Sequence, residues 1–223
     1  APSPRLPAQR PGPRGGKRDR NRRERTAALL DAALTLFLER GVEGVSIEAI
    51  AGAAGLAKGS FYRYFQGKPE LVAALVAPVR EELRAALERA RAALAVAEAP
   101  LAVLAAYADL AAAVEATLRA HPRLARLYLQ EARAPATPAR RPLAALSEFV
   151  AASAIELTRE AQARGLLRPV PATVSALAVV GAAERLLEAW LAGQLDGAGE
   201  GVAAALVEIA LCGLQPEPPA EAP

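Results

Sequence analysis

Cysteine, histidine and aromatic residues are scarce in this chain. Its 223 residues include one Cys, one His and no Met, and Phe, Trp and Tyr together make up 4%. One cysteine excludes a disulfide framework within the chain and a zinc site built on several cysteines. One histidine excludes a metal site with several histidine ligands. We therefore expect no metal site.

Catalytic constellations are also missing from the sequence. No Gly-rich phosphate loop follows a predicted strand, and acidic pairs such as Glu81 and Glu82 lie on charged helix faces. The lone histidine, His121, precedes Pro122 at a helix junction, where we expect a cap or a surface residue. Without a nucleophile–base pair or a metal cluster, we expect no enzyme activity, no catalytic residues and no cofactor.

Long uncharged apolar runs are absent as well. No stretch of 18 or more residues is both strongly apolar and free of charge, so we expect no transmembrane helix and no membrane partner. The first residues carry Pro and Arg in place of the apolar segment of a secretory signal. These two features predict a cytoplasmic protein.

What the chain does contain is a large supply of helix-forming apolar residues. Hydrophobic residues make up 53% of it and charged residues 23%, which is enough to form a buried core in one domain or two small ones. Ala and Leu supply most of the apolar residues, and they favour helices, whereas strands favour Val, Ile and aromatics. No strand pattern is present, so the sequence predicts an all-α protein.

Positive charge is concentrated at the N-terminus. Residues 1–26 hold nine Lys and Arg against two Asp and Glu, a net charge of +7. The rest of the chain holds 27 − 9 = 18 basic and 24 − 2 = 22 acidic residues, a net charge of −4. A basic arm on an acidic body indicates a polyanion partner, although a solvated tail without a specific role would look the same. We expect residues 1–20 and the Pro- and Glu-rich residues 215–223 to be disordered.

Caps and apolar periodicity predict nine helices. An Asn21–Glu24 capping box is expected to open the first helix, and Ser46 is expected to cap the second. Pro78 is expected to kink the fourth helix. The predicted helices are 21–40, 47–54, 57–64, 68–97, 100–120, 122–133, 141–164, 172–192 and 200–212.

Residues 46–71 form the most informative stretch. Two short helices with Gly55 at the turn between them are typical of a helix-turn-helix, whose second helix enters the major groove of DNA. Phe61 and Phe65 are spaced to face the core, and Gly59 lets the backbone approach DNA closely. Polar residues of the second helix can reach phosphates or base edges: Lys58, Ser60, Tyr62, Arg63 and Tyr64. For the two tyrosines, core packing is the alternative.

The string KGSFYRYFQGKPEL at residues 58–71 closely resembles the signature of the TetR family of bacterial transcriptional regulators. The resemblance is specific over about residues 22–75. It implies that Ser46 and Lys68 bind backbone phosphates, although Ser46 could be a plain helix cap and Lys68 a solvated charge. Arg63 lies at a position that varies in the family. Together, the candidate DNA-binding residues are Ser46, Lys58, Gly59, Ser60, Tyr62, Arg63, Tyr64 and Lys68.

The resemblance also implies two domains, a DNA-binding domain at 21–67 and a ligand-binding and dimerisation domain at 68–214. In the family, the last two helices pair with the same helices of a second subunit. The apolar helix 172–192 fits this arrangement, although burial in a monomer would explain it too. The interface residues we expect are Val174, Leu177, Ala178, Gly181, Leu195, Ala205 and Val207. Cys212 is expected to be buried near this interface.

The ligand of such a domain is harder to predict. The middle helices carry few polar side chains, so a cavity among them would favour a hydrophobic small molecule, acyl or aromatic. For each candidate lining residue, plain core packing is the alternative. The candidates are Leu104, Tyr107, Tyr128, Glu131, Phe149 and Trp190.

The sequence therefore predicts a homodimeric, sequence-specific transcriptional regulator. We expect a repressor that a hydrophobic ligand releases from a palindromic operator in double-stranded DNA, with the long fourth helix as the lever. The alternative is a non-specific DNA-binding or structural helical protein without ligand control.

Overall fold

The computed structural model describes residues 16–195 and 201–214. These residues form nine helices and no strand, so the all-α prediction is confirmed for the described part of the chain. The predicted tail at 215–223 and most of the predicted arm lie outside it. The helices are α1 (Lys17–Arg40), α2 (Ile47–Ala53), α3 (Lys58–Phe61), α4 (Lys68–Val96), α5 (Pro100–Ala120), α6 (Pro122–Glu131), α7 (Arg141–Ala163), α8 (Ala172–Leu191) and α9 (Val202–Leu214).

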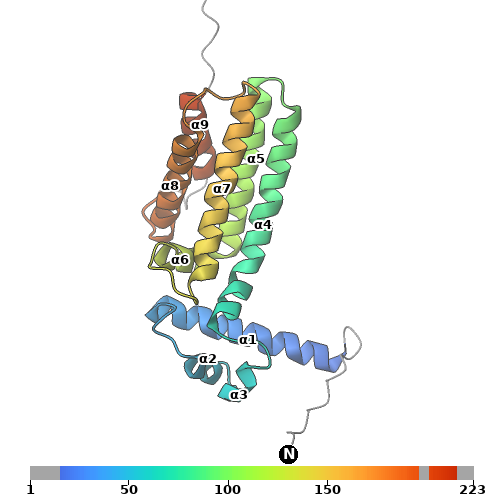
Figure 1. The fold of residues 1–223 in the computed structure, drawn as a ribbon, viewed down its shortest axis with the longest axis vertical. Coiled ribbons are helices and arrows are strands. Elements are labelled where there is room, and N and C mark those ends of the chain that lie inside the picture. The colour runs from blue at the N-terminus through green and yellow to red at the C-terminus, as the bar shows by residue number, and fades with distance from the viewer. Residues whose placement is uncertain (1–15, 196–200, 215–223) are drawn as a thin grey trace, which may run out of the picture.

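The longer helices form an elongated bundle, and α1, α2 and α3 form a smaller unit at its lower end, which we call the foot (Figure 1). Helices α4, α5, α7, α8 and α9 run along the bundle, and α1 lies across its lower end with α2 and α3 beneath it. The short α6 lies between the bundle and α1, and it packs against both α1 and α8. Helix α6 is therefore placed to contact both parts of the molecule.

Helix α1 begins earlier than the sequence predicted. It starts at Lys17 after Gly16, so residues 17–20 are helical and the predicted capping box at Asn21 does not open the helix. Arg23 donates a hydrogen bond to Asp19 at 3.0 Å, an i,i+4 pair that supports the first turn. No Pro or Gly interrupts residues 17–40, so nothing in the sequence stops the helix at Asn21.

The helix-turn-helix forms as predicted, with a shorter second helix. The Ser46 hydroxyl accepts a hydrogen bond from the Ala49 amide at 3.1 Å and caps α2. Helix α3 ends at Phe61 instead of residue 64, because the Arg63 and Tyr64 amides donate to carbonyls three residues back and tighten the chain into a turn. Through this turn Phe61 and Phe65 both reach the core, where they are buried.

One apolar core joins the foot to the lower bundle. Its largest buried members come from both predicted domains: Phe37, Phe61, Leu71, Leu127 and Leu143. Apolar burial on this scale stabilises each side chain by about 2–3 kcal/mol, so the two parts support one another.

Helix α5 is the one described helix that is long and apolar enough to cross a membrane. It carries Asp109 and Glu115, and it packs against α4 and α9 within the bundle. One stripe of α5 also lines the main cavity.

Candidate DNA-binding surface and ligand cavity

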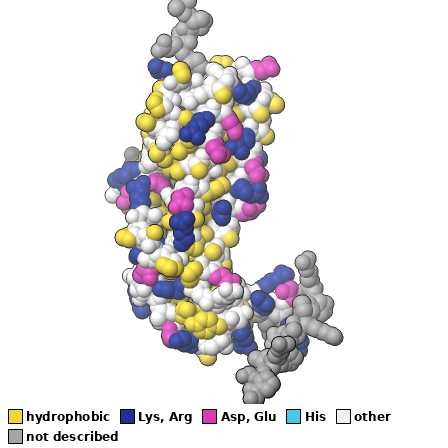
Figure 2. Space-filling model, viewed as in Figure 1, with side chains coloured by type: hydrophobic (Ala, Val, Ile, Leu, Met, Phe, Trp, Pro, Cys, Tyr) yellow, Lys and Arg dark blue, Asp and Glu magenta, His cyan; other side chains and the backbone are white. Residues whose placement is uncertain are grey.

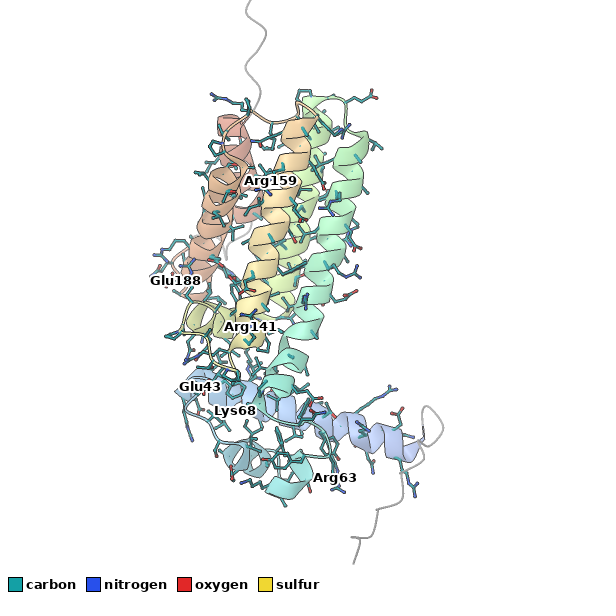
Figure 3. All side chains as sticks on the ribbon, in the orientation of Figure 1. Glu43, Arg63, Lys68, Arg141, Arg159 and Glu188 are labelled. Atoms are coloured by element: carbon teal, nitrogen blue, oxygen red, sulfur yellow. The ribbon has the colours of Figure 1, made fainter. Side chains whose placement is uncertain are left out.

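The foot of the molecule presents the predicted DNA-binding residues to solvent. Lys and Arg side chains surround this end on the face shown in Figure 2. Ser46, Lys58, Gly59, Tyr62 and Arg63 are exposed, and Arg63 points outward from the foot in Figure 3. Polar groups on an exposed short helix are accessible to phosphates and base edges.

The two tyrosines of this surface differ in burial. Tyr62 is 50% exposed, and its ring packs edge-on against Phe61 with the centroids 5.6 Å apart. Core packing therefore does not account for Tyr62. Tyr64 is partly buried against the core, so the core-packing alternative applies to part of its surface.

Short polar contacts hold two of the surface residues in place. Lys58 forms an ion pair with Glu48 of α2, and their hydrogen bond lowers the pKa of Glu48 and raises that of Lys58. Arg63 donates a hydrogen bond to the partly buried Ser60 at 3.2 Å. A phosphate would compete with these exposed contacts, which are each weak.

Lys68 occupies a different position from the other candidates. Its ammonium donates hydrogen bonds to the carbonyls of Val42 at 3.0 Å and Glu43 at 3.4 Å, and it lies 3.7 Å from the Glu43 carboxylate. Its side chain is 19% exposed, so the alternative of a solvated charge is wrong. Lys68 joins the start of α4 to the loop between α1 and α2. Its phosphate contact stays a prediction.

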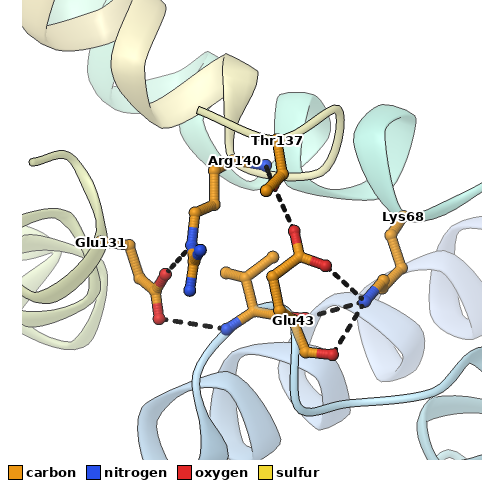
Figure 4. Close-up of polar contacts among 6 residues, drawn as sticks. Glu43, Lys68, Glu131, Thr137 and Arg140 are labelled. Atoms are coloured by element: carbon orange, nitrogen blue, oxygen red, sulfur yellow. Dashed lines mark hydrogen bonds and ion pairs between the residues drawn. The ribbon is translucent and has the colours of Figure 1, made fainter. Parts of the chain in front are cut away.

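Glu131 lies in a second set of contacts at the same loop, and the prediction that it lines the ligand cavity is wrong. The buried Glu131 carboxylate accepts a hydrogen bond from the Val42 amide at 3.1 Å and one from Arg140 at 2.6 Å (Figure 4). The side chain therefore points toward the foot. Gly41, with φ at +72°, brings the chain so close that a Cβ there would lie 2.9 Å from Glu131 Oε1.

Thr137 completes this group of contacts. Its hydroxyl donates to the Glu43 carboxylate, and this bond, together with Lys68 and Arg140, holds the pKa of Glu43 below its ordinary value. We call the six residues the polar clamp: Val42, Glu43, Lys68, Glu131, Thr137 and Arg140. The polar clamp connects the α1–α2 loop to α4, α6 and the segment before α7.

A cavity of about 350 Å³ lies inside the bundle. Helices α4 to α9 all contribute to its lining, which is almost entirely apolar. Tyr107, Tyr128 and Trp190 line it, as predicted. Its size and apolar character are typical of small-molecule sites.

Two other predicted lining residues lie elsewhere. Leu104 faces outward from α5 and is 37% exposed. The guanidinium carbon of Arg80 lies 5.5 Å from the centroid of the Phe149 ring. The next residue, Val150, lines the cavity instead of Phe149. Both predictions are wrong because the apolar faces of α5 and α7 are wider than the strip that reaches the cavity.

The polar groups of the cavity gather mostly toward its α6 end. Tyr128 donates a hydrogen bond to Glu184 at 2.6 Å, and Arg133 forms an ion pair with the same carboxylate. Burial raises the pKa of Tyr128 to about 12. His121 occupies the N-cap position of α6 and lines the cavity. Its Nε2 atom lies 3.1 Å from Oε1 of Glu82. Sequence reasoning missed Glu184, although a lone acid within the apolar run of residues 176–187 was a usable signal.

An exposed apolar surface runs along α8 and α9. Val174 is 66% exposed and Leu177 is 45% exposed, and Ala178 and Ala205 are also exposed. Gly181 and Leu195 are partly buried. Val207 was predicted to lie at the interface. It instead lines the cavity and packs inward from α9. Ile209 of α9, which is not among the predicted interface residues, is 71% exposed.

No group of three or more His, Cys, Asp or Glu side chains among the described residues could hold a metal ion. The Cys212 side chain lies outside the described part of the chain.

Comparison with known proteins places the foot in a family. The model of "Bacterial regulatory proteins, tetR family" matches residues 29–75. The HTH-type transcriptional repressor KstR2 of Rhodococcus jostii is 39% identical over 59 residues, covering 26% of this chain and 29% of that protein. The HTH-type transcriptional regulator TcmR of Streptomyces glaucescens is 36% identical over 84 residues, covering 37% of each. These matches span less than two fifths of either relative.

Solved structures share the fold over most of the chain. FadR of Bacillus halodurans, a fatty acid degradation regulator, has a TM-score of 0.65 at 19% identity and covers 92% of this chain and 98% of its own. The ketosteroid transcriptional regulator KstR2 of Mycobacterium tuberculosis has a TM-score of 0.63 at 23% identity, covering 86% and 96%. With the helix-turn-helix signature at the foot, these findings show that residues 29–75 match the TetR family of bacterial regulatory proteins and that the described chain shares the fold of these solved regulators.

Proposed function

We propose that the chain is a sequence-specific DNA-binding transcriptional regulator, a repressor that a hydrophobic small molecule releases from its operator. The observation that carries the proposal is the position of α6. Leu124 and Tyr128 of this helix line the cavity, and Glu131 at its end bonds the loop that leads into the helix-turn-helix. A molecule in the cavity can therefore act on the DNA-binding foot through one short rigid element.

The DNA-binding residues of the proposal are those the sequence suggested: Ser46, Lys58, Gly59, Ser60, Tyr62, Arg63, Tyr64 and Lys68. The exposed Tyr62, Lys58 and Arg63 would contact DNA directly. Ser46 would bind a phosphate at the start of α2. Lys68 would do so after its ammonium exchanged a loop carbonyl for a phosphate oxygen.

We infer a homodimer from two observations. Apolar side chains that include Val174, Leu177 and Ile209 stay exposed on α8 and α9, and a partner that covers them would gain the free energy of their burial. A dimer would also place two recognition helices on half-sites about 34–36 Å apart, or a multiple of that, on a palindromic operator. The domain division at 67/68, the basic arm of residues 1–20 and a cytoplasmic location belong to the same proposal.

The ligand we propose is hydrophobic because the cavity lining is apolar. Two structural neighbours are related to molecules with a large apolar part: FadR of Bacillus subtilis was solved in complex with stearoyl-CoA, whose acyl chain is hydrophobic, and KstR2 of Mycobacterium tuberculosis is a ketosteroid regulator. Release would follow if the molecule binds better to a conformation whose two feet no longer match the operator spacing. The polar clamp is the contact through which α6 would move the foot.

The first experiment is selection of bound duplexes from a random DNA pool at near-physiological salt. We expect one palindromic sequence, with the ratio of specific to non-specific binding preserved as salt rises. Recovery of no preferred sequence, with affinity that collapses with salt, would instead support the alternative of a non-specific DNA-binding or structural protein. A chain lacking residues 1–20 tests in the same assay whether the arm adds affinity.

A further inference from the structure

One polar group of the cavity has no partner. The hydroxyl of Tyr107 is buried and makes no hydrogen bond among the described residues. The other hydroxyls of the lining are all occupied: Tyr128 donates to Glu184, Thr158 to the Ala154 carbonyl at 2.8 Å, and Ser175 to the Ala172 carbonyl at 3.2 Å. An unpaired buried hydroxyl is unfavourable, so Tyr107 has a strong tendency to bond any acceptor that enters.

The surroundings of Tyr107 restrict the charge of that acceptor. The side chain packs against two apolar clusters, whose buried members include Leu94, Val103, Leu157, Leu167 and Leu211. Along α5 the nearest charged lining residues are Glu115 and Arg119, about 12 and 18 Å away at 1.5 Å per residue. A carboxylate or phosphate beside Tyr107 would lose its hydration without gaining a cation, which is costly. The acceptor that fits is uncharged.

The proton of Tyr107 is retained over the whole physiological range. Burial raises the pKa of its hydroxyl to about 12. At neutral pH the group is therefore a hydrogen-bond donor, and an oxygen without a proton of its own suits it best.

The cavity is elongated along the bundle. On α5 the lining residues extend from Tyr107 to Arg119, about 18 Å of helix, and on α8 from Ser175 to Trp190, about 22 Å. The helices of the bundle run side by side in Figure 1, so the two stripes flank the same channel. A rod-shaped apolar molecule fits a channel of this form.

We infer that the cavity takes an elongated, uncharged, mostly apolar molecule whose one ketone, ester or ether oxygen accepts a hydrogen bond from Tyr107, at the end away from the DNA-binding foot. This inference rests on the proposed function of the cavity and names the chemical class of its ligand. Tyr107 is then the residue that selects molecules with an acceptor over pure hydrocarbons.

Two fluorescent probes of similar size test this inference. Prodan carries a ketone, and diphenylhexatriene is a hydrocarbon rod; both are titrated into the full wild-type chain and into Tyr107→Phe. The variant keeps the ring and removes only the hydroxyl. We expect diphenylhexatriene affinity to stay within twofold, prodan affinity to decrease about tenfold, and the emission of bound prodan to shift to shorter wavelength, because one hydrogen bond is worth about 0.5–1.5 kcal/mol.

A second variant and a competitor pair complete the test. Ala111→Phe fills the channel beside Tyr107 and should weaken both probes, which would place them in the cavity. Methyl dodecanoate should displace prodan at a concentration at least tenfold below that needed with dodecanoate. Equal prodan affinity in wild type and Tyr107→Phe, or a stronger effect of dodecanoate, would overturn the inference.

The test separates this inference from the proposed function. If neither probe binds the wild-type chain, the inference is wrong and so is the proposed ligand control, while the DNA selection still decides the regulator role. If both probes bind but Tyr107→Phe changes neither, only the assignment of the acceptor fails.

Discussion

The carboxylate of Glu131 accepts a hydrogen bond from the backbone amide of Val42, a residue 89 positions earlier in the chain. The same carboxylate bonds Arg140, and it is buried. This pair joins the end of a cavity-lining helix to the loop before the helix-turn-helix. A motion that carries the end of α6 away from the α1–α2 loop would stretch or break this hydrogen bond.

Replacing Glu131 should therefore weaken the whole molecule. Glu131→Ala leaves a buried amide and the mostly buried Arg140 without their acceptor, and we expect a loss of about 3 kcal/mol in the free energy of unfolding. Denaturant unfolding measures it. Glu188→Ala, which removes one partner of an exposed ion pair with Arg185, is the control and should change stability by less than about 0.5 kcal/mol. Equal losses in both variants would contradict the role of the clamp.

Gly41 should tolerate no side chain. Its φ of +72° and ψ of 160° belong to a region that only glycine adopts readily, and a Cβ would also press on Glu131 Oε1. We expect Gly41→Ala to lower the free energy of unfolding, measured by thermal denaturation, by about 3 kcal/mol. Gly165→Ala is the matched control, since its φ is +70° but its Cβ would meet nothing within 4 Å. It should cost about 1 kcal/mol from backbone strain alone.

Tyr62→Ala should separate DNA binding from folding. The ring is half exposed and packs only edge-on against Phe61, so we expect a small loss of stability. Affinity for the selected operator should decrease about tenfold or more if the side chain contacts DNA. Fluorescence anisotropy with the operator measures this, beside circular dichroism of the variant. Wild-type affinity in Tyr62→Ala would remove α3 and its turn from the interface.

Acid should weaken the clamp through Glu43. The pKa of this carboxyl is lowered in the folded chain from its ordinary 4.5, so its stabilising contribution is complete above that pH and is lost as pH falls through the folded value. We expect the melting temperature of wild type to exceed that of Glu43→Gln at pH 7 and the difference to shrink at pH 3.5. The side chain is partly exposed, so the effect is below about 1 kcal/mol. A difference that grows toward low pH would contradict this sign.

Charge on the exposed face of α8 should break the dimer. Leu177→Arg places a cation among the apolar side chains of that face. We expect sedimentation to show the proposed dimer for the wild type and a monomer for the variant. Leu101→Arg is the control, because Leu101 is 75% exposed at the start of α5, outside this face. A dimer that survives Leu177→Arg would place the interface elsewhere.

The sequence predicted the helices well because their ends are marked locally. Ser46, Gly55 and Pro100 each act within one turn of the chain, and the structure has helix boundaries beside all three. The start of α1 was missed because its charged residues are good helix formers that also suit a disordered arm.

The contacts of the site were less predictable because they depend on distant segments. Glu131 was expected in the cavity, yet its partner is a main-chain amide that no side-chain pattern reveals. Val207 was assigned to the wrong face because α9 is apolar on all sides, so periodicity cannot choose a direction. The cavity candidates that do line the channel are aromatic residues: Tyr107, Tyr128 and Trp190.

Because the apolar channel of about 350 Å³ exists only in the folded chain, the stability of the protein indicates whether a compound occupies it. A compound that fills the channel and ignores the unfolded chain raises the stability by mass action, about 2.7 kcal/mol at a hundred times its dissociation constant. Melting temperature then ranks a compound library without an operator, a promoter or a cell. The compounds that raise it most would identify the chemical signal to which the regulated genes respond.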